Sequence, residues 1–261
     1  MNLKKDWLFL KSFRFAKANP GKIGLMILFD LLFVASFFYV FPAFAKYLNQ
    51  NLTISQTMTF AITLIVLDIV YKLLTLFAYS FFKYCVLDSV KSIFQKTEFS
   101  LKRLWKFCLL NIILFVPPYL VLGFILSGIK EAYRPYVFIF LGLAISPFLY
   151  IIINIAQSYF YQGASIKKSV SKGFEFLNKK EVYKGVILIL VIFLLLYGAL
   201  LWLISYSFNY IVSNNYTSYL IQHAYFKSIS IIVFDALFYC IIVVNRLSFY
   251  NLAKCQKFSY L

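Results

Sequence analysis

The chain has 261 residues, of which 62% are hydrophobic and only 13% charged, with a mean hydropathy of +0.82. Soluble domains carry about a quarter charged residues, so this composition excludes a water-soluble globular enzyme and a disordered protein and indicates a polytopic membrane protein. The net charge is +17. Because the basic residues lie between long apolar runs, we expect an anionic lipid surface as their partner rather than nucleic acid.

Six apolar runs are long enough to cross a bilayer, since a helical span needs about 20 mostly apolar residues. In chain order they cover residues 23–45, 58–82, 104–129, 136–159, 182–205 and 228–244. We therefore predict an all-α membrane protein, with six transmembrane helices in a single membrane domain over residues 1–261. Pro117 and Pro118 in the third run and Pro147 in the fourth predict kinks, because each proline removes a backbone donor.

Lysine and arginine are distributed unevenly among the connections between these runs. Of the 26 basic residues, 21 lie in the first 22 residues, in the connections between spans two and three and between spans four and five, and in the C-terminal tail. The opposite connections hold four. Cytoplasmic segments carry the excess of Lys and Arg, so we predict a multi-pass cell-membrane protein with both termini in the cytoplasm. The bias toward Lys, Asn, Ile, Tyr and Phe is typical of an AT-rich, prokaryotic genome.

Three basic segments, at about residues 3–18, 86–97 and 164–178, carry apolar residues at helical spacing with lysines between them. Basic amphipathic helices of this kind lie in the headgroup layer, and we expect these three to be interfacial helices on the cytoplasmic side. The alternative is that they extend the spans and pack on one another. The expected contacts with anionic lipid headgroups come from Lys4, Lys5, Lys11, Lys91, Lys96, Lys167, Lys168 and Lys172.

A repeating unit emerges from this order: an amphipathic helix, a span, a short outer loop and a returning span, three times over. Residues 62–68 read ITLIVLD and residues 229–235 read ISIIVFD, which align without a gap and place an aspartate at the same position. Self-similarity at a fixed period indicates an internal repeat. We therefore expect three repeated helix-hairpin units.

The segment that joins the fourth and fifth spans, residues 163–177, reads GASIKKSVSKGFEFL. It resembles the "G-x-S-x-x-x-S/A" amphipathic connector of a broad group of six-span proteins that includes the membrane domain of glycerophosphoryl diester phosphodiesterases. The motif combines a helix cap with a face of small residues. The resemblance implies a membrane-embedded helical domain, and it carries no catalytic residue across, because the family's chemistry belongs to a separate soluble domain.

Four ionisable residues, Asp30, Asp68, Lys72 and Asp235, interrupt the apolar runs and form the candidate intramembrane polar site. Each costs roughly 2.5–3.5 kcal/mol on insertion scales. Asp68 and Lys72 are four residues apart and share a helix face, so they form either a neutralising pair or part of a path for an ion, proton or solute. Asp235 is protonated, hydrated or paired across helices, for instance with Lys72. Asp30 is expected to reach water or Lys22.

Three amides, Asn111, Asn154 and Gln157, also lie in the third and fourth runs. Such groups form hydrogen bonds between transmembrane helices, worth about 0.6 kcal/mol each on average. We expect them to join helices rather than to bind a ligand.

Signatures of catalysis and of metal binding are absent from the sequence. The chain has one histidine, and its four cysteines lack metal-ligand spacing; no known catalytic motif occurs. We therefore expect no metal, no cofactor and no enzymatic activity, the basic helices alone favouring an enzyme that acts on lipid headgroups. The leading hypothesis is a non-enzymatic, bilayer-bound scaffold or accessory subunit, with a membrane protein as a possible partner. The alternative is a transporter of a small solute, ion or lipid that uses Asp68, Lys72 and Asp235.

Overall fold

The computed structural model describes residues 8–40, 42–43, 46, 58–211 and 216–257, and these form helices and short connections without strands. The elements in chain order are α1 (Leu8–Ala18), α2 (Pro20–Ala35), the π-helix η1 (Ser36–Val40), α4 (Met58–Ser92), α5 (Leu101–Ser127), the 3-10 helix η2 (Glu131–Tyr133), α6 (Arg134–Tyr161), α7 (Ile166–Glu175), the 3-10 helix η3 (Phe176–Asn178), α8 (Lys180–Ile211) and α9 (Tyr216–Lys257).

Five helical segments of the described chain are long and apolar enough to cross a membrane, and a bent pair makes a sixth. The five are Pro20–Tyr39, Ile65–Ser92, Leu101–Ser127, Val186–Tyr206 and Ala224–Lys254. The bent pair, Glu131–Gly142 and Ala144–Tyr161, meets at an angle of 45°. An all-helical membrane protein with five or six candidate spans is thus what the chain forms, in agreement with the architecture expected from its apolar runs.

Proline acts differently in the two helices that contain it. In α6 the break between Gly142 and Ala144 lies four residues before Pro147, where the proline ring meets the carbonyl of the residue four positions earlier. The kink expected from Pro147 is therefore present. In contrast, α5 passes through Pro117 and Pro118 as one span of 27 residues.

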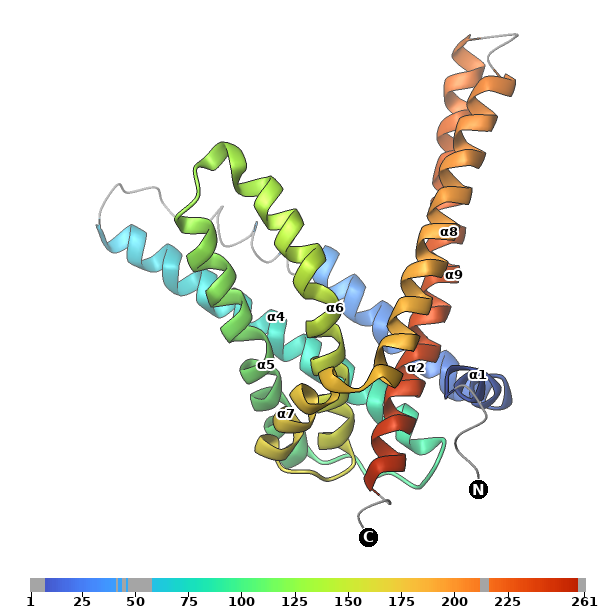
Figure 1. Ribbon diagram of the computed structural model, residues 1–261. Helices are drawn as coiled ribbons and strands as arrows, with labels where there is room; N and C mark the ends of the chain where they lie inside the picture. The colour runs from blue at the N-terminus through green and yellow to red at the C-terminus, as the bar shows by residue number, and fades with distance from the viewer. Residues whose placement is uncertain (1–7, 41, 44–45, 47–57, 212–215, 258–261) are drawn as a thin grey trace.

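The helices converge at one end of the bundle, here called the basic end, where α4, α6 and α9 finish and α2, α5 and α8 begin. Every residue from Ile151 to Tyr161 of α6 is buried, and most of the other buried residues lie at residues 80–90 of α4, 104–114 of α5 and 243–253 of α9. At the opposite, open end the helices diverge. Figure 1 shows α8 and α9 running side by side as a long hairpin that points away from α4, α5 and α6.

Two short helices close the basic end. Helix α1 packs on the end of α9, where Asn251 donates a hydrogen bond to Ser12. It also contacts the α4–α5 connection, where the Phe15 ring meets the Phe94 ring edge to face at 5.2 Å between centroids. Helix α7 packs on the last turns of α6. Its first turn is capped by Ser165, whose hydroxyl accepts a hydrogen bond from the Lys168 backbone nitrogen. The capping function expected for the 163–177 motif is therefore present.

The three expected amphipathic segments have different outcomes. The first coincides with α1 from Leu8 onward, and the third with α7 and η3. The second, residues 86–97, is not a separate helix: residues 86–92 are the final turns of α4, and Val86, Leu87 and Val90 are buried in the core. This segment extends a span, which was the alternative reading. Interfacial placement, the three repeated units and the cytoplasmic side stay predictions.

We expect Gly173→Ala to loosen the packing of α7 on α6. A β-carbon at Gly173 would lie 2.9 Å from the Ile152 carbonyl oxygen and 3.4 Å from the Ala156 β-carbon, and overpacking of this kind typically costs about 1–3 kcal/mol. The thermal midpoint of unfolding in detergent should fall by several degrees.

The matched control is Gly123→Ala in α5, where nothing lies within 4 Å of the added carbon. This variant should melt at the parent temperature or slightly above it, since alanine is the better helix former. Equal midpoints for the two variants would contradict the close contact between α7 and α6.

Candidate functional site

Asp68 and Lys72 form the ion pair that their spacing predicts, on the open-end half of α4. The Lys72 Nζ lies 2.5 Å from Asp68 Oδ2, and it also lies over the Tyr119 ring of α5, 5.2 Å from the centroid. Both side chains are about half exposed, at 48% for Lys72 and 56% for Asp68. This pair therefore faces the surroundings of the protein rather than the interior of the bundle.

Asp235 does not meet Lys72, so the cross-helix pair considered from the sequence is not formed. Asp235 is exposed on α9, in the part of α9 that forms the hairpin with α8, and this hairpin diverges from the first half of α4 (Figure 1). The open end therefore has two arms, one formed by α4, α5 and α6 and the other by α8 and α9 (Figure 1). Asp68 and Lys72 lie on the first arm, and Asp235 lies on the second.

Asp30 has a different partner from those expected. Its carboxylate pairs with the Arg246 guanidinium and accepts a hydrogen bond from the Tyr239 hydroxyl, whereas the sequence pointed to water or Lys22. The side chains of Arg246 and Asp30 are only 17% and 15% exposed. The sixth apolar run ends at residue 244, which predicts Arg246 in the C-terminal tail, but α9 continues to Lys257 and carries Arg246 into the bundle. Its apolar neighbours Val243, Val244 and Leu247 were the available signal.

Lys83 is a buried lysine that sequence reasoning placed in a connection. The residue is 6% exposed, and its Nζ donates to Asn154 Oδ1 of α6 at 3.3 Å. It becomes buried because α4 does not end at the first charge after the apolar run but continues to Ser92. Asp30 and Arg246 lie close enough to interact with it electrostatically.

Amide groups connect these charges to a wider network. Gln157 of α6 donates to Asn111 Oδ1 at 2.8 Å and to the Tyr79 hydroxyl at 3.3 Å, and Asn111 of α5 donates to Ser80 Oγ of α4 at 2.9 Å. The expectation that Asn111 and Gln157 join helices is confirmed. A further bond runs from Asn245 of α9 to the Tyr150 hydroxyl of α6 at 3.0 Å.

We call this set the buried polar layer, because its members bridge α2, α4, α5, α6 and α9 within the basic half of the bundle. Its members are Asp30, Tyr79, Ser80, Lys83, Asn111, Tyr150, Asn154, Gln157, Tyr239, Asn245 and Arg246. The layer holds two basic side chains, Lys83 and Arg246, and one carboxylate, Asp30. Buried charges persist when they are paired and hydrogen-bonded, so this layer acts first as the connection between helices.

A second polar cluster closes the basic end. The Tyr161 hydroxyl at the end of α6 donates to Asp88 of α4, which also accepts a bond from Thr97 in the α4–α5 connection. Arg103, near the start of α5, donates to the backbone carbonyls of Phe160 and Tyr161. The Phe160 carbonyl also accepts a bond from the Gly163 backbone nitrogen at 2.9 Å. Arg103 adds a donor to both carbonyls at the end of α6, where a helix leaves its last carbonyls without partners within it, and these bonds fix the start of α5 beside it.

The lysines predicted to contact lipid divide into several groups. Lys4 and Lys5 lie outside the described residues, and Lys11 lies on α1. Lys96, Lys167 and Lys168 are exposed, whereas Lys91 lies over the Tyr161 ring at 5.5 Å. Lys172 donates to Glu175 at 2.5 Å, and this hydrogen bond lowers the pKa of the Glu175 carboxyl.

The described residues include no cluster of three or more His, Cys, Asp or Glu side chains that is placed to bind a metal ion. The described cysteines Cys85, Cys108 and Cys240 are free thiols.

We expect the Asp30–Arg246 pair to contribute strongly to stability. Asp30→Asn or Arg246→Met leaves the other charge buried without its partner, which should lower the free energy of unfolding by about 3–5 kcal/mol. The double variant should lose less than the sum of the two single losses. The measurement is unfolding of the purified protein in mixed detergent, followed by circular dichroism.

The same cycle on Asp68→Asn and Lys72→Met is the control, because that pair is half exposed. Each of these variants should change the free energy of unfolding by no more than about 1 kcal/mol. Losses of similar size in both cycles would show that the Asp30–Arg246 pair stabilises the fold no more than the half-exposed pair does.

Comparison with known proteins gives no relative for this chain. No protein-family model, curated protein or solved structure matches it. The likeness of residues 163–177 to the six-span group stays a prediction. What the apolar helices indicate is a membrane protein.

Proposed function

We propose that the protein is a non-enzymatic accessory subunit, or scaffold, whose open-end helix halves pack against a transmembrane helix of a partner membrane protein. The observation that carries the proposal is the exposure of charged side chains within apolar helices. Asp68 and Lys72 lie in the candidate span Ile65–Ser92, and Asp235 lies in Ala224–Lys254. All three are exposed in this chain.

The energetic argument concerns what covers these charges. An ionisable group at the centre of a bilayer costs roughly 2.5–3.5 kcal/mol on insertion scales, and such groups almost always face protein or water rather than lipid. Pairing lowers the cost for Asp68 and Lys72. Among the described residues, no Lys or Arg side chain forms an ion pair with Asp235. A polar group on a partner helix would lower the cost at both places.

The basic half of the molecule supports the same function. There the buried polar layer and the Tyr161–Asp88 cluster bind the helices to one another, so this half is a closed core. In the open-end halves of α4, α5, α8 and α9, most of the described side chains are exposed or half-buried. A closed core with two diverging arms leaves room for a helix of a partner protein to pack between the arms or beside them, as the proposed accessory function requires.

Transport is the second candidate function, and the arrangement favours it less. Transporters gather their polar residues around a shared site near the bilayer midplane. Here Asp68 and Lys72 lie on α4, while Asp235 lies on the α8–α9 hairpin that diverges from it. The separation of these residues supports a role in contacting a partner.

Site-specific photo-cross-linking in native membranes tests the proposal. A photoreactive amino acid replaces Ile65, one turn from Asp68, or Ile232, one turn from Asp235; both isoleucines are more than half exposed. We expect a discrete protein adduct from each position. The adduct should weaken by at least severalfold when the nearby charges are removed, by Asp68→Asn with Lys72→Met or by Asp235→Asn.

The control position is Phe124 on α5, which is 82% exposed and has no charged residue within one helical turn. It should give lipid adducts without a discrete protein band. Adducts that do not depend on the charges would contradict the proposed contact, and robust solute flux through the purified protein in liposomes would favour transport instead.

A further inference from the structure

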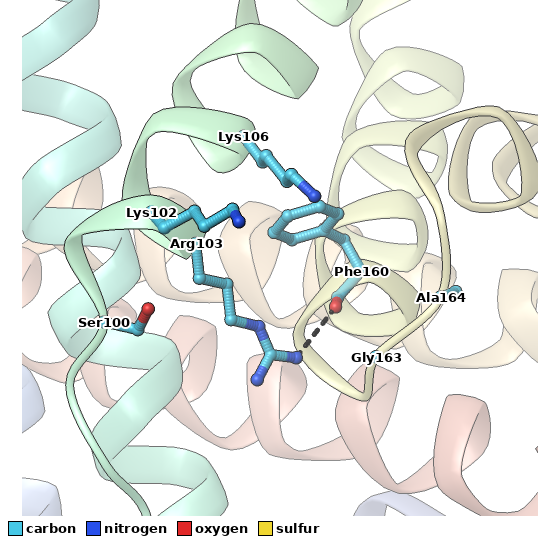
Figure 2. Close-up of a pocket in the computed structure, with 7 residues that line it drawn as sticks. All are labelled: Ser100, Lys102, Arg103, Lys106, Phe160, Gly163 and Ala164. Atoms are coloured by element: carbon cyan, nitrogen blue, oxygen red, sulfur yellow. Dashed lines mark hydrogen bonds between the residues drawn. The ribbon is translucent and has the colours of Figure 1, made fainter.

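We infer that a pocket at the basic end, between the start of α5 and the end of α6, binds a phosphate group. The pocket has a volume of about 260 Å³ and is lined by Ser100, Lys102, Arg103, Lys106, Phe160, Gly163 and Ala164. Figure 2 shows the three basic side chains extending from α5 toward the end of α6. None of these residues was among those expected to contact lipid.

The charge of the pocket has one sign. Lys102, Arg103 and Lys106 are its ionisable lining residues, and no carboxylate lies among the residues that line it. Within the part of the chain that the structure describes, none of the three forms an ion pair. Three uncompensated cations around one hollow repel one another, and an anion between them would remove that repulsion.

The Arg103 side chain lines the pocket in a fixed position. Its guanidinium is held by the carbonyls of Phe160 and Tyr161 and lies 5.0 Å from the centre of the Tyr161 ring. Because the group is planar and carries five N–H donors, some donors stay available when others bind carbonyls. Lys102 and Lys106 are exposed and can adapt their position to a ligand.

The first residues of α5 also line the pocket. Ser100 occupies the N-cap position with an extended backbone and makes no side-chain capping bond, and the first turn carries no acidic residue. The first N–H groups of a helix have no partner within it, and the helix dipole favours an anion there. The opposite rim is open because Gly163, at a φ of +98°, has no side chain and nothing lies within 4 Å of its missing β-carbon.

The surroundings match a phosphate carried by a lipid. The pocket lies where the apolar span of α5 begins, and Leu101 and Trp105, which neighbour its lysines in the sequence, are 65% and 64% exposed. Tryptophan is enriched at the level of the headgroups. A phosphate in the pocket would leave the acyl chains of its lipid next to these two side chains. Free inorganic phosphate offers the same binding group, so the two sources need separate arms of the experiment.

The lipid arm uses Trp105 as its reporter. Trp7 and Trp202 are replaced by Phe, and the protein is placed in phosphatidylcholine vesicles that contain dibrominated phosphatidic acid, phosphatidylglycerol or phosphatidylcholine as the quencher. We expect the two anionic lipids to bind next to Trp105 about thirtyfold more tightly than phosphatidylcholine, given two lysines near an anionic headgroup. The preference should disappear in K102Q/K106Q and persist in K102R/K106R.

The matched control is K167Q/K168Q, which removes two exposed lysines from α7 at the same end of the bundle. It should keep the preference at Trp105. In the second arm, inorganic phosphate is titrated against chloride at constant ionic strength while the thermal midpoint in detergent is recorded. A phosphate-dependent rise that is lost in K102Q/K106Q, without a lipid preference, would identify soluble phosphate as the ligand.

Two results would overturn the inference, provided that K102Q/K106Q melts at the parent temperature. One is an equal loss of lipid preference in K102Q/K106Q and K167Q/K168Q, which would show a diffuse electrostatic effect. The other is the absence of any effect of K102Q/K106Q in both arms. Neither result bears on the photo-cross-linking at the open end, so the two proposals stand or fall separately.

Discussion

The fold depends on one constraint: polar groups inside an apolar bundle must find their partners within the protein. The buried polar layer meets this constraint by connecting helices that are far apart in the chain. Asp30 and Arg246 join α2 to α9, at opposite ends of the sequence, and Gln157 joins α6 to both α4 and α5. Because an unpaired buried charge is so costly, these bonds set which helix faces meet and confine the close packing to the basic half.

The features that depend only on residues close together in the chain could be predicted from the sequence. The length of the apolar runs predicted the helices, the spacing of Asp68 and Lys72 predicted their pair, and Pro147 predicted the bend of α6. The failures have a common origin. A hydropathy window ends a span at its first charges, yet α4 continues beyond Lys83 and α9 beyond Arg246, because partners on other helices compensate those charges. Partners 71 and 216 residues away leave no mark on local periodicity.

The two ends of the bundle differ in where their charged side chains lie. At the basic end, Asp88 and the α6 carbonyls hold their donors in defined positions, and the cations of the α5 start surround a hollow. At the open end, Asp68, Lys72 and Asp235 face outward from apolar helices. The proposed ligand of the first is small and anionic, and the proposed ligand of the second is another helix. The closed core between them keeps the two surfaces independent.

The length of α9 has a consequence for the membrane itself. Its candidate span, Ala224–Lys254, has 31 residues and is about 46 Å long at 1.5 Å per residue, which is about one and a half times the 30 Å thickness of a hydrocarbon core. A helix cannot shorten, so excess apolar length is absorbed by tilt or by local thickening of the bilayer. At the open end, α8 runs beside α9 while α4, α5 and α6 point away from this hairpin (Figure 1), so we expect bilayer thickness to act on the inclination of the hairpin. We therefore expect the opening between the α8–α9 hairpin and the other helices of the open end to vary with the thickness of the bilayer.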